Sequence, residues 1–218
     1  MRLDPRNRDT YLYEQGWAYT LLGRRNEAIP ALKRDLVRYP SQFMAHSFLG
    51  SDYSFLGDED GAWAQAATVE RAIAVSPNSP AVYVALADLL NSLGKPAEAL
   101  VAMDKAMRLD PHSHDNDSGY SWDQGLAFTL PGRPKEAIAA LKRWLSLYPD
   151  NFWAHAYLAV DYMELGHNDA ARAEAAEALR LDPQFTVEMV FPTVSLQHKA
   201  LPAEIDRFRA DLHEAGLK

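Results

Sequence analysis

The stretch PAVYVALADLLNSLGKPAEALVAMDKAMRLDP, from Pro80 to Pro111, decides the fold. It predicts two helices, near 79–93 and 96–109, joined by a short turn at Gly94. A glycine at this point ends the first helix in a conformation that costs other residues more. Pro96 is tolerated in the first turn of the second helix, and the closing proline cannot continue that helix. The stretch is therefore expected to form a helical hairpin.

The same punctuation recurs along the chain with a period of about 34 residues. Prolines that close such phrases follow one another at spacings of 35, 37, 34, 38 and 34 residues, and they are Pro5, Pro40, Pro77, Pro111, Pro149 and Pro183. Glycines of the turn follow at 34, 37, 38 and 34 residues, and they are Gly23, Gly57, Gly94, Gly132 and Gly166. Two independent marks with one period predict a series of five hairpins.

Small residues mark the place where the two helices of each hairpin cross. When each unit is numbered so that its turn glycine is position 15, position 8 holds Gly16, Gly50, Ala87, Gly125 and Ala159. Position 20 holds Ala28, Ala62, Ala99, Ala137 and Ala171. Only such small residues let two helix backbones approach closely. With Tyr83 at position 4, Leu86 at 7, Leu90 at 11 and Ala106 at 27, the third unit resembles the tetratricopeptide repeat (TPR) family at every major position.

The resemblance implies an all-α fold, a right-handed TPR superhelix of about five helix-turn-helix repeats with a C-terminal helical cap. We expect the array to span residues 1–183, with units at about 9–40, 43–77, 80–111, 118–149 and 152–183. The first helices are expected near 9–22, 42–56, 79–93, 118–130 and 151–165, and the second near 25–38, 59–75, 96–109, 134–147 and 168–181. Pro30 lies deeper in its helix and should strain or kink it, and residues 114–117 should bulge as a loop.

Residues 184–218 read differently from the repeats. The phrase PAEIDRFRADLHEAG predicts one amphipathic helix with Ile205, Phe208 and Leu212 on one stripe. FTVEMVFPTV predicts a short helix that breaks before Pro192. Solenoids need a terminal cap with a polar outer face, so we interpret 184–218 as that cap and as a natural terminus.

A longer repeat lies over the short one. EAIPALKR (27–34) matches EAIAALKR (136–143), and YPSQFMAHSFL (39–49) matches YPDNFWAHAYL (148–158), both at an offset of 109 residues. Units 4 and 5 are thus copies of units 1 and 2. The phrase MRLDP ends unit 3 and also opens the chain, which predicts a fragment or re-started piece of a longer protein; a short native leader is the alternative.

Composition excludes several classes of function. The net charge of −8 argues against a nucleic-acid surface, and the absence of cysteine removes disulfides and thiolate metal sites. No apolar run approaches the ~20 residues of a membrane helix, and no secretory signal is visible, so we expect a cytoplasmic protein without membrane or nucleic-acid partners.

No catalytic motif is present, and we expect neither an enzyme nor a cofactor. His112 and His114 beside two aspartates suit a metal, but a solvated loop explains them as well, and we predict no metal site. His46 and His155 occupy position 4, and we expect them to pack between the two helices of their units.

The informative residues are those that the TPR resemblance places on the concave face, at positions 2, 5, 9 and 12 of each first helix. We expect a peptide-binding groove formed by Tyr13, Trp17, Ser47, Ser51, Val84, Asp88, Asn91, Trp122, Leu126 and Trp153. No groove position is Lys or Arg, so the family's clamp for acidic C-termini is absent. The aromatic and small polar character, with Asp88 at the centre, suits an apolar peptide or helix that carries a positive charge. The alternative is that Trp17 and Trp122 pack between repeats.

Several phrases, among them YLYEQGWAYTLLGRRNEAIPALKR and ARAEAAEALRLDPQFTVE, resemble the C-terminal repeat region of bacterial class III adenylate/guanylate cyclases and of some winged-helix regulators. The resemblance implies a regulatory or assembly module of a larger signalling protein, with any catalytic residues upstream. The alternatives are a stand-alone adaptor that binds a partner or a second copy of itself and, last, an enzyme.

Overall fold

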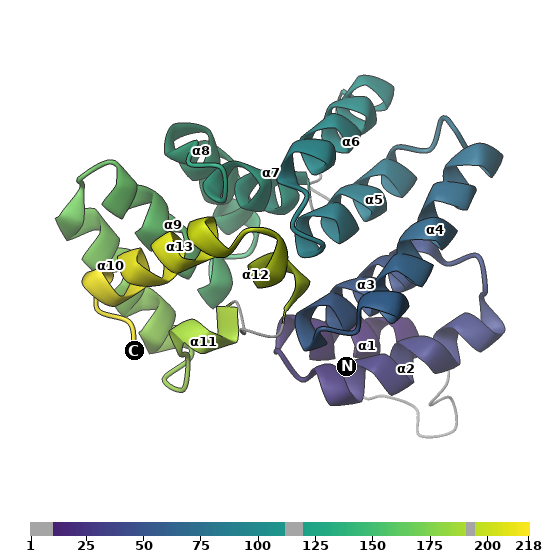
Figure 1. Cartoon of the computed structure of the whole chain (residues 1–218), viewed down its shortest axis with the longest axis horizontal. Coiled ribbons are helices and arrows are strands. Elements are labelled where there is room, and N and C mark those ends of the chain that lie inside the picture. Colours follow the sequence, from purple (N-terminus) through teal and green to yellow (C-terminus); the bar gives the residue numbers. More distant parts are fainter. Residues whose placement is uncertain (1–10, 112–119, 191–194) are drawn as a thin grey trace.

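The computed structural model describes residues 11–111, 120–190 and 195–218, and the described part is all helical (Figure 1). The first helices of the five hairpins are α1 (Leu12–Leu21), α3 (Phe43–Leu56), α5 (Pro80–Ser92), α7 (Tyr120–Thr129) and α9 (Phe152–Glu164). The second helices are α2 (Arg25–Arg38), α4 (Glu59–Val75), α6 (Pro96–Leu109), α8 (Pro134–Leu147) and α10 (Asn168–Leu181). The predicted series of ten helices is confirmed.

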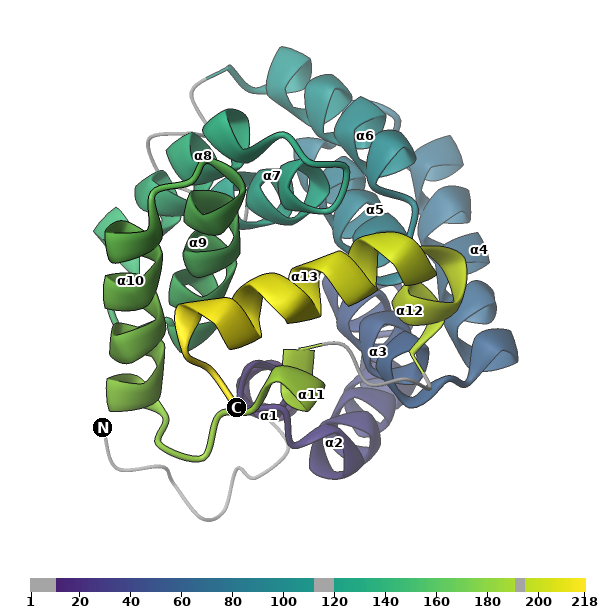
Figure 2. The same ribbon diagram turned by 60° about the vertical axis from the view of Figure 1, so that its left-hand side comes forward.

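The hairpins stack into a right-handed superhelix. Figure 2 shows the first helices on the inside of the curve and the second helices on the outside. Gly94, like the other four turn glycines, has a positive φ, here 73°, which confirms the predicted end of each first helix. Pro30 lies inside α2, which continues through it as one helix. His112, His114, Pro192 and the predicted loop at 114–117 fall outside the described residues.

Close helix approach explains the small residues. An added Cβ at Gly16 would lie 2.6 Å from Leu32 of α2, and one at Gly125 would lie 2.5 Å from Leu141 of α8. The alanines at position 20 are fully buried in all five units. The small residues therefore let the two helices of each hairpin pack closely against each other.

The C-terminal segment, residues 195–218 together with α11 (Val187–Val190), packs across the array (Figure 2). Its helix α13 (Pro202–Ala215) buries the predicted stripe of Ile205, Phe208 and Leu212 against α9 and α10. The short helix α12 (Leu196–Ala200) reaches back to α3 and α5. The segment thus covers the last repeat, as a cap does, and also contacts the second and third hairpins.

Two contacts hold that segment at the turns of the repeats. Ala200 lies so close to Gly94 that an added Cβ there would come within 2.6 Å of it. The guanidinium of Arg207 donates a hydrogen bond of 2.9 Å to the carbonyl of Leu130 and pairs with Glu164 at 2.9 Å. Position 94 therefore requires glycine for two reasons: its φ is positive, and Ala200 leaves no room for a side chain.

Candidate functional site

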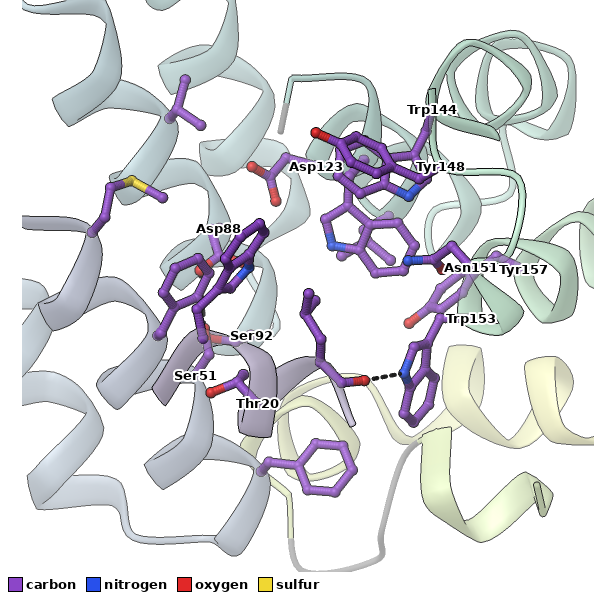
Figure 3. Close-up of a pocket in the computed structure, with 18 of the residues that line it drawn as sticks. Thr20, Ser51, Asp88, Ser92, Asp123, Trp144, Tyr148, Asn151, Trp153 and Tyr157 are labelled. Carbon is purple, nitrogen blue, oxygen red and sulfur yellow. Dashed lines mark hydrogen bonds between the residues drawn. The ribbon is translucent and has the colours of Figure 1, made fainter. Parts of the chain in front are cut away.

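The inner helices enclose a central cavity of about 400 Å³ (Figure 3). Its walls come from α1, the start of α2, α3, α5, α7, α8 and α9, together with two residues of the C-terminal part of the chain, Val190 and Gln197. This size lies within the range of about 300–1,000 Å³ that is typical of ligand pockets.

Eight of the ten residues expected in the groove line this one cavity: Tyr13, Trp17, Ser51, Val84, Asp88, Trp122, Leu126 and Trp153. Ser47 and Asn91 do not line it, since both side chains are buried between helices. The hydroxyl of Ser47 lies 2.8 Å from the carbonyl of Ala85, and the amide of Asn91 donates to the carbonyl of Asp123 at 3.0 Å. These two residues hold the walls together.

Two aromatic clusters face the cavity. On α1 and α3, Phe48 lies 6.1 Å from Tyr13 and 6.4 Å from Trp17, ring centre to ring centre. On α7 to α9, Trp122 lies 5.9 Å from Trp144 and 5.8 Å from Tyr157, the latter edge to face. Such contacts keep large apolar surfaces in fixed orientations around the cavity.

Sequence reasoning missed several lining residues. Phe48 and Tyr157 stand at position 6 of their units, and Phe55 stands at position 13. Trp144 lies on the second helix α8, and Tyr148 directly follows that helix. An aromatic residue stands at position 6 in both copies, Phe48 and Tyr157, and this shared feature could have indicated that position 6 also faces the cavity. Positions 2, 5, 9 and 12 describe an open groove, whereas this cavity also has side walls.

One side of the cavity is bounded where the superhelix closes on itself. The indole N–H of Trp153, at the start of α9, donates a hydrogen bond of 2.9 Å to the carbonyl of Leu21, at the end of α1 (Figure 3). These residues are 132 positions apart in the sequence. The first and fifth hairpins therefore meet at this point.

Asp88, on α5, lines the same cavity as the two aromatic clusters. Its Oδ2 accepts hydrogen bonds from Ser47 at 2.6 Å and from Ser51 at 3.2 Å. Among the residues that the structure describes, its Oδ1 accepts none. Burial raises the pKa of Asp88, and the two serine hydroxyls and the charge of Arg25 act against that rise.

Arg25 is the one cation among the described residues that line the cavity, and it is already paired. Its guanidinium contacts Oδ1 of Asp52 at 2.7 Å and lies 3.6 Å from the centre of the Phe55 ring. Thr20 donates a further hydrogen bond of 2.9 Å to Asp52. Burial raises the pKa of Asp52 to about 6, and the contact with Arg25 limits that rise.

The second copy keeps half of this arrangement. Thr129 donates to Oδ2 of Asp161 at 3.2 Å, as Thr20 does to Asp52, but Pro134 stands where the first copy has Arg25. Oδ1 of Asp161 is buried without a hydrogen-bond partner. Burial raises the pKa of Asp161 to about 9, with only the Thr129 hydroxyl and the more distant Arg207 opposing it. Asp161 is therefore a neutral acid at pH 7.

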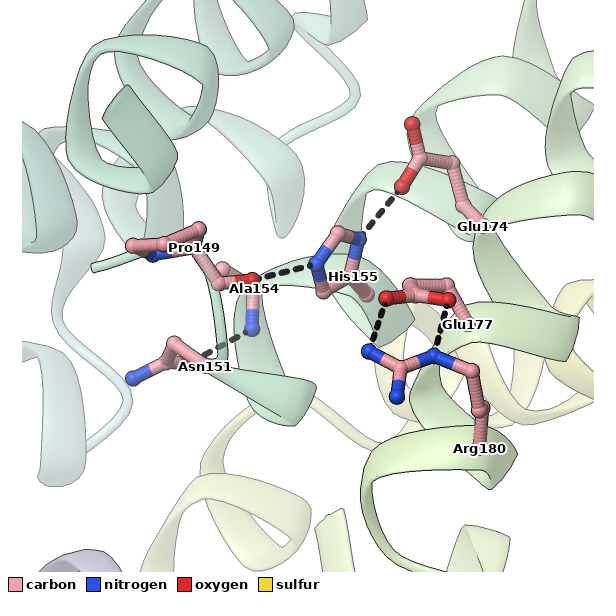
Figure 4. Close-up of polar contacts among 7 residues, drawn as sticks. All are labelled: Pro149, Asn151, Ala154, His155, Glu174, Glu177 and Arg180. Carbon is pink, nitrogen blue, oxygen red and sulfur yellow. Dashed lines mark hydrogen bonds and ion pairs between the residues drawn. The ribbon is translucent and has the colours of Figure 1, made fainter. Parts of the chain in front are cut away.

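The two histidines at position 4 tie helices together, as expected. His155 contacts Oε2 of Glu174 at 2.6 Å through Nδ1 and the carbonyl of Pro149 at 3.1 Å through Nε2 (Figure 4). His46 repeats this pattern with Gln65 and Pro40. Burial alone would lower the pKa of His155, but its hydrogen bonds to Glu174 and to the Pro149 carbonyl raise it overall. These are structural contacts between helices.

Across residues 11–111, 120–190 and 195–218, no three His, Asp or Glu side chains gather in a way that could hold a metal ion. In the same ranges, no helix combines the length and the apolar character needed to cross a bilayer.

Comparison with protein families identifies the repeats. Models described as tetratricopeptide repeat match residues 10–41, 80–113 and 130–188. This chain is a tetratricopeptide repeat protein. The models leave residues 42–79 unmatched, yet α3 and α4 form the same hairpin there. No curated protein shows significant similarity to the chain.

Solved structures agree with the fold. A crystal structure of TTC0263, a thermophilic TPR protein in Thermus thermophilus, has 24% identity and a TM-score of 0.59, covering 81% of this chain and 92% of its own. PilW, a widely conserved type IV pilus biogenesis factor, has 20% identity and a TM-score of 0.55, covering 95% and 93%. These similarities concern the TPR fold alone.

Proposed function

We propose that this chain is a protein-interaction module that holds a short apolar segment of a partner protein in its central cavity. The observation that carries the proposal is the aromatic cavity, in which eight residues of the expected concave face come together, Asp88 among them. Clusters of Trp and Tyr in desolvated pockets dominate the free energy of binding in protein interfaces. A rigid repeat scaffold holds such a cluster ready for a ligand.

The shape of the cavity favours a short segment over a long one. The contact between Trp153 and Leu21 closes one side, and Val190 and Gln197 line another. A long helix would have to separate α1 from α9, whereas a chain end or a tight turn needs no such movement. Asp88 adds a preference for a positive charge beside the apolar residues.

Peptide display tests this proposal. We expect selection on the intact chain to enrich short peptides that combine an aromatic or aliphatic residue with Lys or Arg. Trp17→Ala should weaken binding of an enriched peptide at least tenfold. The matched control is Trp63→Ala, since Trp63 lies on the outer helix α4, away from the cavity, and is 40% exposed. Equal effects of the two substitutions, or no enrichment at all, would contradict the proposal.

We further propose that the module belongs to a larger cyclase-like or transcriptional regulator and controls the assembly or activity of its output domain. The support is the sequence resemblance of the repeat phrases to the C-terminal region of those proteins. The coding sequence upstream of Met1 tests it. A catalytic or winged-helix domain in frame is the expected result, and an in-frame stop codon directly upstream would leave the stand-alone adaptor as the better description.

A further inference from the structure

Asp88 is a carboxylate without a counter-charge of its own. The cavity contains one described cation, Arg25, and that guanidinium lies 2.7 Å from Asp52. The serines that contact Asp88 both donate to Oδ2, which leaves Oδ1 without a described partner. Asp88 is half-buried and lines the cavity, so a group bound there can reach its carboxyl group. A cationic group in the cavity would complete this acceptor.

The aromatic residues that line the same cavity suit the alkyl part of such a group. Trp17 packs against Phe48, and Trp122 packs against Tyr157. The faces of aromatic rings carry negative potential and attract cations, most strongly for Trp and most usefully for weakly hydrated ammonium groups. The chain already uses this contact in the same cavity, where Arg25 covers the ring of Phe55 at 3.6 Å.

We propose that the central cavity binds an alkylammonium group, with its charge against Oδ1 of Asp88 and its alkyl carbons against the tryptophan faces. This inference rests on the proposed function, because it names the chemical group that the same cavity recognises. Two sources share this chemistry: the lysine side chain of a partner segment, and a free quaternary ammonium compound of small size.

The tryptophans provide a direct readout. Four of the five tryptophans in the chain, Trp17, Trp122, Trp144 and Trp153, line the cavity, and Trp63 does not. In a Trp63→Phe background, intrinsic fluorescence therefore reports on the cavity. The probes are choline and 3,3-dimethyl-1-butanol, which has the same shape with carbon in place of the charged nitrogen.

We expect choline to change the fluorescence with a saturable curve and to bind at least tenfold more tightly than the neutral alcohol. Asp88→Asn should weaken choline binding to the level of the alcohol and leave binding of the alcohol unchanged. Equal affinity of the two probes for the Trp63→Phe chain would overturn the proposal without need of any further variant. Unchanged choline binding in a folded Asp88→Asn chain, checked by circular dichroism, would overturn it as well.

A third probe separates the two sources. If a blocked lysine dipeptide binds more tightly than choline, the group is the side chain of a partner; the reverse order identifies a free quaternary ammonium ligand. Failure of this inference is distinguishable from failure of the proposed function. Enriched peptides without any preference for charge would retain the interaction module and reject the ammonium site, whereas choline binding without peptide enrichment would do the opposite.

Discussion

The duplication places the same aspartate in two environments, and the same substitution should therefore have opposite effects. Asp52 is held by Arg25 and Thr20, whereas Asp161 is held by Thr129 alone, with Pro134 in place of the arginine. We predict that Asp161→Asn stabilises the chain at pH 7 and that Asp52→Asn destabilises it.

The magnitude for Asp161 follows from its pKa. Burial raises that pKa from 3.8 to about 9, so the folded state keeps a proton that the unfolded chain loses. A raised acid pKa lowers the free energy of unfolding as pH rises from 3.8 towards 9. At pH 7 the loss is about 3 units times ~1.36 kcal/mol, or about 4 kcal/mol. Asparagine carries no such proton, so Asp161→Asn should recover about 4 kcal/mol at pH 7 and only about 1.5 kcal/mol at pH 5.

Asp52→Asn removes one partner of a buried ion pair and leaves the charge of Arg25 uncompensated. Breaking such a pair costs about 3–5 kcal/mol, which outweighs the roughly 3 kcal/mol that removing a carboxyl group with a pKa of about 6 would return at pH 7. Urea unfolding of both variants, followed by circular dichroism at pH 5 and pH 7, measures all four values. The reasoning fails if both substitutions shift the free energy of unfolding in the same direction, or if the gain from Asp161→Asn does not depend on pH.

Three further predictions concern the scaffold. Pro30→Ala should raise the free energy of unfolding by up to about 3 kcal/mol, because Pro30 is exposed and the second copy has Ala139 at this place; a loss in urea unfolding would refute this. Gly125→Ala should lower it by about 1–3 kcal/mol, since the new Cβ would lie 2.5 Å from Leu141, and an unchanged unfolding midpoint would count against the helix contact. The raised pKa of His155 stabilises the fold fully below about pH 6.5, and this contribution is lost as pH rises through the folded pKa. Glu174→Gln should remove this pH dependence of the free energy of unfolding, and Gln65→Glu should create it at His46 in the first copy. Unaltered pH profiles of the variants would be the contrary result.

The sequence was sufficient for the repeats because their signals are local. Gly94 and Pro96 mark a turn whose position does not depend on the rest of the molecule, and the same marks recur in every unit. The small residues at the helix crossings, such as Gly16, indicated close packing directly. Helix bounds could therefore be predicted from residue spacing, and the resemblance to the TPR family added the positions of the inner face.

The closure of the array could not be predicted in this way. The contact between Trp153 and Leu21 depends on the sum of small rotations over all five hairpins, and no local pattern contains that sum. The path of the C-terminal segment was missed for the same reason. The stripe of Ile205, Phe208 and Leu212 predicted an amphipathic helix, but its amphipathic pattern does not say that the chain continues back to α3 and α5.

The measurement that tests the central claim most directly is a crystal structure of the chain bound to a peptide enriched by display. We predict that a short segment of the peptide occupies the central cavity, with an apolar side chain against Trp122 and its cationic group beside Asp88. A peptide bound on the outer helices, with the cavity unchanged, would contradict the account.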